Sequence, residues 1–175
     1  MRAAATRGTG GMDTPIEQSY LEGRSDVLRW TSEPLVDELA VSGWPELELH
    51  ASSDREDTEW HVRLADEHPD GKAYEVAQGR MRAAYRDSFG DPTPLRPGET
   101  YLFRIELTAL THAFLPGHRL RVTLTSSDFP MYARSLNRFG SYRDLADGQA
   151  ALNTITADSR IVLPVTRGSL PEDRR

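Results

Sequence analysis

Apolar and polar residues alternate most regularly in residues 111–130 of the chain. Leu120, Val122 and Leu124 occupy every second position after the turn Pro116-Gly117. Polar residues fill the positions around them: Arg119, Arg121, Thr123 and Thr125. A repeat of two residues is typical of a strand with one buried face and one face toward water. We therefore expect a strand over residues 119–125, ended by the run Ser126-Ser127-Asp128-Phe129-Pro130.

The same alternation recurs in short segments that turns separate. We expect further strands at residues 27–31, 39–42, 45–51, 60–65, 72–76, 80–86, 101–107, 152–156 and 161–165. Pro69-Asp70-Gly71 has the residues of a hairpin turn. A helical repeat of 3.6 residues is nowhere sustained over about ten residues. Strands spaced by turns every ~8–12 residues indicate an all-β protein, either a β-sandwich or a jelly roll.

The two ends of the chain differ from the segment between them. Residues 1–25 carry Gly8, Gly10, Gly11 and Pro15 and lack a hydrophobic repeat, so we expect a flexible linker or lead-in. Residues 26–166 contain all the expected strands and are predicted to be one jelly-roll domain. Residues 167–175 are polar, and we expect a frayed tail there.

Composition narrows the class of protein further. The chain has 175 residues, a formal net charge of -6 and no cysteine. A negative charge argues against a nucleic-acid partner, because binding phosphates requires a basic face. No apolar run approaches the ~20 residues that cross a bilayer, and the N-terminal residues lack the apolar core of a secretion signal. We therefore expect a cytoplasmic protein without nucleic-acid or membrane partners.

Serine-nucleophile chemistry has no recognisable centre in this sequence. The pentapeptide Gly-x-Ser-x-Gly, which places a nucleophile in α/β-hydrolases, does not occur. Ser25, Ser126 and Ser127 stand at the ends of expected strands, where serine commonly forms a hydrogen bond with the turn backbone. We assign no catalytic residue to the chain.

The histidines and acidic residues favour structural roles over metal binding. His50 and His61 could bind a metal together with Glu48 or Asp66 if their strands paired, but metal-site spacings are missing and we expect solvent-facing histidines. The acidic residues within positions 54–59 could bind calcium or form a solvated loop, and the absence of EF-hand spacing favours the loop. We expect no metal and no cofactor. In the loop before residue 119, we expect structural roles for four residues: His112, Pro116, Gly117 and His118.

A long irregular segment follows the strand at residues 119–125. It combines aromatic, apolar, arginine and asparagine side chains: Phe129, Met131, Tyr132, Arg134, Asn137, Phe139 and Tyr142. Such a composition is frequent at protein interfaces and at the rims of ligand sites. Two readings remain open, a surface that contacts a partner or domain and a loop that folds over one end of the sandwich.

Ten short motifs, in order along residues 26–165, resemble the C-terminal domain of the CocE/NonD hydrolases and X-Pro dipeptidyl-peptidases. They are Asp26-Val27-Leu28, Thr31-Ser32-Glu33-Pro34-Leu35, Ala51-Ser52-Ser53-Asp54, Asp57-Thr58, His68-Pro69-Asp70-Gly71, Tyr85-Arg86-Asp87-Ser88, Pro97-Gly98-Glu99, His112-Ala113-Phe114, Pro116-Gly117-His118-Arg119-Leu120-Arg121 and Ser126-Ser127-Asp128-Phe129-Pro130. The Arg-Asn-Pro-Asn run frequent in the family is matched only loosely, by Arg134-Ser135-Leu136-Asn137.

The resemblance implies a non-catalytic jelly roll of the galactose-binding-like type. In the family this domain packs on an α/β-hydrolase domain with a Ser-Asp-His triad, shapes the surroundings of the active site and can take part in a homodimer. The family's reaction is serine-dependent hydrolysis of esters or amides. None of the triad positions falls within this sequence, so we expect the chain by itself to be inactive.

Two other functions remain open. As a stand-alone galactose-binding-like module, the chain could bind carbohydrate through aromatic residues at its loop ends. Trp44, Trp60 and Tyr142 are the candidates, although Trp60 alternates with Val62 and Leu64 and is expected in the core. The other possibility is a remnant without an independent function.

Overall fold

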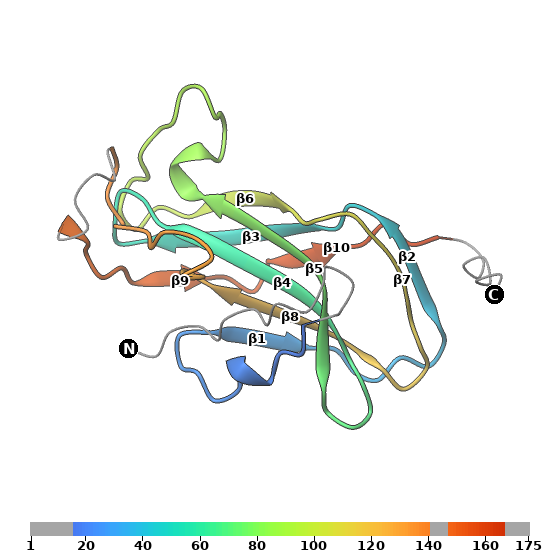
Figure 1. Cartoon of the computed structure of the whole chain (residues 1–175). Coiled ribbons are helices and arrows are strands. Elements are labelled where there is room, and N and C mark those ends of the chain that lie inside the picture. Colours follow the sequence, from blue (N-terminus) through green and yellow to red (C-terminus); the bar gives the residue numbers. More distant parts are fainter. Residues whose placement is uncertain (1–15, 141–146, 167–175) are drawn as a thin grey trace.

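The computed structural model describes residues 16–140 and 147–166 and contains ten strands in these ranges (Figure 1). The strands are β1 (Leu28–Thr31), β2 (Leu39–Gly43), β3 (Glu46–Ser53), β4 (Glu59–Glu67), β5 (Ala73–Arg82), β6 (Tyr101–Glu106), β7 (Leu110–Phe114), β8 (Arg119–Thr125), β9 (Asn153–Ile155) and β10 (Arg160–Val162). Short 3₁₀ helices lie at Ser19–Leu21 and Ala83–Tyr85.

The strands form three antiparallel sheets. The first sheet has the order β1-β8-β4-β5, and the second has the order β10-β3-β6, with β9 also paired to β3. The third sheet contains β2 and β7. The chain passes from the second sheet to the first between β3 and β4 and returns between β5 and β6, as Figure 1 shows. The described residues contain strands and two short 3₁₀ helices but no α-helix, which confirms the predicted all-β class, whereas the finer assignment as a jelly roll stays a prediction.

A single apolar core lies between the first and second sheets. Inward-facing residues of β4 and β8 meet those of β3 and β6: Leu47, Leu49, Trp60, Val62, Leu64, Phe103, Ile105, Val122 and Leu124. The rings of Trp60 and Phe103 join the two layers, with centroids 5.7 Å apart. The inward-facing alternate positions predicted for residues 60–65, 101–107 and 119–125 are therefore confirmed.

The outer face of the first sheet is not the wet face that the alternation suggested. Arg121, Thr123 and Thr125 are all less than a tenth exposed. Residues 16–27 cover part of this face: the backbone N–H of Gln18 donates to Ala73 on β5, and Glu22 forms an ion pair with Arg121 on β8. A repeat of two residues within a strand does not reveal that a segment distant in the sequence buries the strand's polar face.

The packed part of the chain begins earlier than residue 26. The carbonyl of Ile16 accepts a hydrogen bond from the backbone of Glu75, and Gln18 is 1% exposed. The segment expected as a flexible lead-in thus belongs to the fold from at least residue 16. The remainder of that segment, residues 1–15, and the tail expected at residues 167–175 lie outside the described residues. No helix in the described ranges is long and apolar enough to span a membrane.

One strand replaces the two expected around Gly79. β5 runs without a break through this residue, which pairs with Val62 on β4. A Cβ atom at Gly79 would meet the carbonyl oxygen of Glu106 at 2.5 Å, closer than any real contact of this kind. The glycine permits a close approach of two strands rather than a turn.

Candidate partner interface

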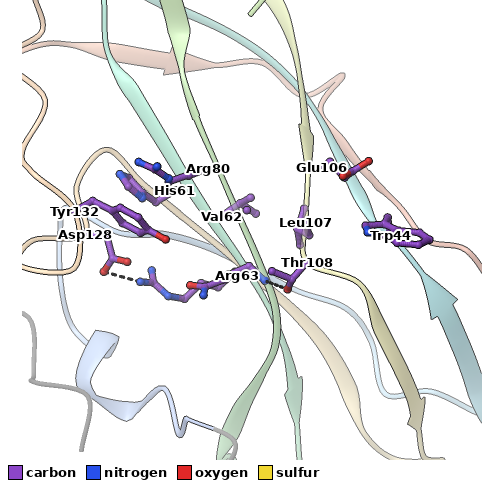
Figure 2. Close-up of a pocket in the computed structure, with 12 residues that line it drawn as sticks. Trp44, His61, Val62, Arg63, Arg80, Glu106, Leu107, Thr108, Asp128 and Tyr132 are labelled. Atoms are coloured by element: carbon purple, nitrogen blue, oxygen red, sulfur yellow. Dashed lines mark hydrogen bonds and ion pairs between the residues drawn. The ribbon is translucent and has the colours of Figure 1, made fainter. Parts of the chain in front are cut away.

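The segment after β8 is anchored to the first sheet by a buried ion pair. Arg63 on the outer face of β4 contacts the Asp128 carboxylate at 2.6 Å and the Glu75 carboxylate at 3.1 Å. The Arg63 side chain is 7% exposed, and Figure 2 shows it reaching toward Asp128 along the floor of a pocket. Because the pair crosses from sheet to loop, it fixes where the irregular segment starts.

Electrostatics keep this arginine charged despite its burial. Burial disfavours the guanidinium cation, but the nearby Asp128, Tyr20 and Glu75 outweigh it and raise the pKa of Arg63. Tyr20 comes from the N-terminal segment, where burial raises the pKa of its phenol. A buried cation with carboxylate partners on β5 and on the segment after β8 is costly to separate from either of them.

Tyr132 forms the second anchor of the segment. Its ring lies 5.4 Å from the ring of His61, and the Arg80 guanidinium lies 4.0 Å from its centroid. His61 is 3% exposed, so the prediction of a solvent-facing histidine is wrong. The ring of Tyr132 covers this part of the sheet, a contact between residues 71 positions apart that spacing cannot reveal.

A pocket of about 310 Å³ lies beside these anchors. His61, Arg80 and Tyr132 line one side of it, and Trp44 lines the opposite side, as Figure 2 shows. Trp44 is 64% exposed, whereas Trp60 is buried in the core as expected. Tyr142 lies outside the described residues, so one of the three rings considered for sugar binding is placed at the surface.

Beyond the anchors, the segment exposes apolar side chains. Phe129 is 50% exposed, Met131 45% and Phe139 39%. Arg134, also exposed, lies 5.9 Å from the ring centroid of Phe129. Asn137 has a left-handed backbone (φ 53°), and its side-chain amide donates to the carbonyl of Gln149 at 2.7 Å. The predicted interface residues are thus gathered on one structured segment, with Tyr142 outside the described part.

The histidines around residues 111–118 converge on a carboxylate that the sequence did not single out as a centre. Asp66 shares its strand face with the core residue Leu64 and is 3% exposed. Its two oxygens lie 2.8 Å from Nδ1 of His118 and 3.0 Å from Nε2 of His112. A third imidazole nitrogen, Nε2 of His68, is 3.8 Å from the same carboxylate.

His118 contacts two other elements. Its ring faces Asp66 on β4, and its backbone carbonyl accepts a hydrogen bond from the backbone N–H of Leu35. Gly117 adopts a φ of +83°, a left-handed conformation that favours glycine at this turn. The cluster connects β4, β7 and the turn before β8.

Metal binding was considered for other histidines. His50 lies on β3 in the second sheet and His61 on β4 in the first, so these strands do not pair as that hypothesis required. In the described residues, one group brings three potential ligand atoms within 4.8 Å of one another: Asp66, His68 and His118. Hydrogen bonds from His118 and His112 already satisfy both oxygens of Asp66, which supports a structural role.

The acidic loop at residues 54–59 also contains a buried anchor. Asp57 is fully buried, accepts hydrogen bonds from the backbone N–H groups of Thr58 and Ala84, and forms an ion pair with Arg82. Burial raises the pKa of Asp57, while Arg82 and the N–H donors act in the opposite direction. The prediction of a solvated loop is therefore wrong at Asp57.

Comparison with known proteins agrees with this structure. The family described as X-Pro dipeptidyl-peptidase C-terminal non-catalytic domain matches residues 3–161. The chain belongs to this family. It is 36% identical over 163 residues to the cocaine esterase of Rhodococcus sp. (strain MB1 Bresler), a match that covers 90% of the chain.

Solved structures of related enzymes share the fold. The domain superposes on a selenomethionine-labelled α-amino acid ester hydrolase with a TM-score of 0.83, 32% identity and 87% of the chain covered. An aminopeptidase from a marine sediment archaeon, Thaumarchaeota archaeon, gives a TM-score of 0.82 and 31% identity over the same share of the chain. The chain spans 28% of the cocaine esterase, 27% of the ester hydrolase and 28% of the aminopeptidase.

Proposed function

We propose that this domain packs on an α/β-hydrolase domain and forms part of the wall around its active site. The observation that carries the proposal is the exposed apolar surface of Phe129, Met131 and Phe139 on a segment anchored by Arg63–Asp128. Contiguous exposed apolar side chains mark interaction sites. Because the anchors order the segment before binding, little conformational entropy is lost when a partner covers it.

The proposed reaction of the complete protein is hydrolysis of an ester or amide bond. The similar proteins are named as an esterase, an ester hydrolase and an aminopeptidase, which supports this substrate class. The serine nucleophile would stand on the hydrolase domain, because the chain contains no Gly-x-Ser-x-Gly pentapeptide. The domain itself would contribute shape and rigidity rather than catalytic groups.

Two finer aspects belong to the same proposal. The complete protein would form a homodimer, which analytical ultracentrifugation measures directly. Its location would be the cytoplasm, as the sequence predicts, and fractionation of the source cells tests that location.

A chimera tests the packing of the two domains. In the Rhodococcus cocaine esterase, this chain would replace the part that it matches, and hydrolysis of a p-nitrophenyl ester would be measured. We expect turnover from the chimera and none from the chain alone. The double variant Phe129→Ser/Met131→Ser should lower the melting temperature of the chimera by several degrees, because half-exposed apolar side chains lose their partner.

The matched control is Phe89→Ser, since Phe89 is 90% exposed on the loop between β5 and β6. This variant should leave the melting temperature of the chimera unchanged. In the isolated chain, the double variant should lower the melting temperature much less than in the chimera, because the partner that would cover the exposed half of these side chains is absent. Equal effects of the double variant and the control in the chimera would overturn the proposed contact.

A further inference from the structure

An apolar groove runs along the edge of the sandwich between β1 and the pair β9 and β10. Its volume is about 400 Å³. Trp30 and Val122 line the side of the first sheet, and Leu47, Ile155 and Ile161 line the side of the second. The groove is distinct from the segment at residues 129–139, whose residues take no part in it.

Register shows that the groove exposes an inner face. Trp30 stands opposite Val122 and Leu28 opposite Leu124 in the pairing of β1 with β8. Directly opposed residues of antiparallel strands point to the same side of a sheet. Val122 and Leu124 are buried in the core, yet Trp30 is 48% and Leu28 47% exposed. These two side chains point between the sheets, and the described residues leave about half of each exposed.

The second sheet ends before it covers β1. The first sheet has four strands side by side, whereas the second has three positions, because β9 and β10 follow one another along the same edge of β3. Within the described residues, no strand pairs with the outer edge of β9 or β10. Figure 1 shows β1 at the border of the sandwich, beyond β8.

We propose that an extended segment of the hydrolase part of the protein lies in this groove and completes the second sheet opposite β1. This inference rests on the proposed function. The segment would carry apolar side chains at alternate positions and cover Trp30, Leu28 and Ile161. Addition of a strand to a free sheet edge is a common mode of recognition, in which side-chain pockets supply the specificity.

The shape of the edge defines how the segment binds. β9 and β10 have three residues each, and residues 156–159 interrupt the edge between them. Backbone pairing is therefore limited to two short stretches, and the apolar contacts with the groove contribute most of the binding. An interrupted edge of this kind also resists pairing with arbitrary strands.

The chain's own ends do not match this occupant. Residues 1–15 contain two methionines and no other large apolar residue, and residues 167–175 contain Leu170 alone. Neither stretch offers alternating apolar side chains. A second copy of the domain would present the same concave groove, and two concave surfaces do not fill one another. The hydrolase part of the complete protein is the source that we propose, since the chain spans only 28% of the related cocaine esterase.

Footprinting of the chimera described above tests the inference. Hydroxyl-radical oxidation of Trp30, quantified by mass spectrometry, would be compared between the isolated chain and the chimera. We expect the oxidation rate of Trp30 to fall several-fold in the chimera, with Phe89 as the unchanged reference. In a parallel test, Trp30→Glu should lower the melting temperature of the chimera by several degrees, whereas Val36→Glu, at a residue 87% exposed, should not.

The outcomes separate this inference from the proposed function. A chimera that neither hydrolyses ester nor gains stability over the isolated chain would overturn both. An active chimera in which Trp30 stays as reactive as in the isolated chain would overturn the inference alone. A concentration-dependent dimer of the isolated chain that Trp30→Glu abolishes would assign the groove to a second copy and would also overturn it. If Trp30→Glu fails to fold, the footprint of the unmodified chain still decides.

Discussion

Asp66 illustrates what sequence reasoning finds and misses at the scale of single residues. The structural roles expected for His112 and His118 stay predictions, and both side chains contact one buried carboxylate. Asp66 itself received no such role because it is separated from them by about 50 positions. The repeat of two places Asp66 on the core face of β4, and an aspartate at such a position needs partners from elsewhere.

Replacing this carboxylate tests the structural role. Asp66→Asn keeps the shape of the side chain but turns one acceptor into a donor that faces an imidazole. Leaving buried polar groups without partners costs about 1–3 kcal/mol each. We expect the free energy of unfolding, measured with urea, to fall by about that amount. Asp37→Asn, at an exposed aspartate, is the control and should have little effect on the free energy of unfolding. An equally small effect of Asp66→Asn would contradict the structural role of Asp66.

Arg63 and Gly79 show a second limit at this scale. Arg63 lies in a segment whose strand character the alternation predicts correctly, whereas Gly79 falls between two expected strands that the structure joins into one. The partners Asp128 of Arg63 and Glu106 of Gly79 come from other elements, so local spacing contains no information about them. A buried arginine in a strand nevertheless demands a carboxylate, and this demand is the one signal from which the anchor could have been inferred.

At the scale of elements, nine of the ten strands were predictable. The tenth strand, β7, contains His112, which was expected in a loop, and the surroundings of the strands were not predictable either. Every expected strand overlaps an observed one, because half-buried strands impose a repeat of two on the sequence. The segments expected at residues 72–76 and 80–86 merge into β5, since the glycine between them serves a close approach. The N-terminal segment has no repeat because its role is to cover the first sheet through polar contacts.

Those polar contacts predict a pH-dependent attachment of the N-terminal segment. Hydrogen bonds from Arg29 lower the pKa of Glu22 below its ordinary 4.5, burial opposes this, and Arg121 lowers it further. A lowered pKa in the folded state means that the contribution to stability is present above pH 4.5 and is lost as the pH falls through the folded pKa.

The variant Glu22→Gln measures this contribution. Because the side chain is 43% exposed, we expect it to lower the free energy of unfolding at pH 7 by no more than about 1 kcal/mol. The difference from the unmodified protein should shrink toward zero as the pH is lowered below the folded pKa. Glu38→Gln, at an exposed position, should show no such trend. A difference that persists unchanged in acid would indicate a packing effect rather than a charge effect.

At the scale of the whole molecule, the sandwich depends on contacts between its layers. The all-β class followed from the short strands and turns, and the order of the short motifs gave the family resemblance. The pairing of strands followed from neither. Partner residues of β1 and β8 are at least 90 positions apart in the sequence, and those of β3 and β10 are more than 110 positions apart. Long-range pairing of this kind is decided by which faces bury one another.

The packing of the two layers against each other depends on the side chain of Phe103. It is fully buried on β6, and its ring lies near Trp60 of the first sheet and Tyr101 of its own strand. Phe103→Ala should lower the free energy of unfolding by about 3–5 kcal/mol, because the cavity opens between the sheets. Leu102→Ala is the matched control, since its neighbouring side chain points outward and is 38% exposed. If the two sheets form one cooperative unit, near-ultraviolet and far-ultraviolet circular dichroism should report the same shifted midpoint for Phe103→Ala. Separate midpoints would show instead that each sheet unfolds by itself. The core contacts between the sheets would then couple their unfolding less strongly than the burial of Phe103 implies.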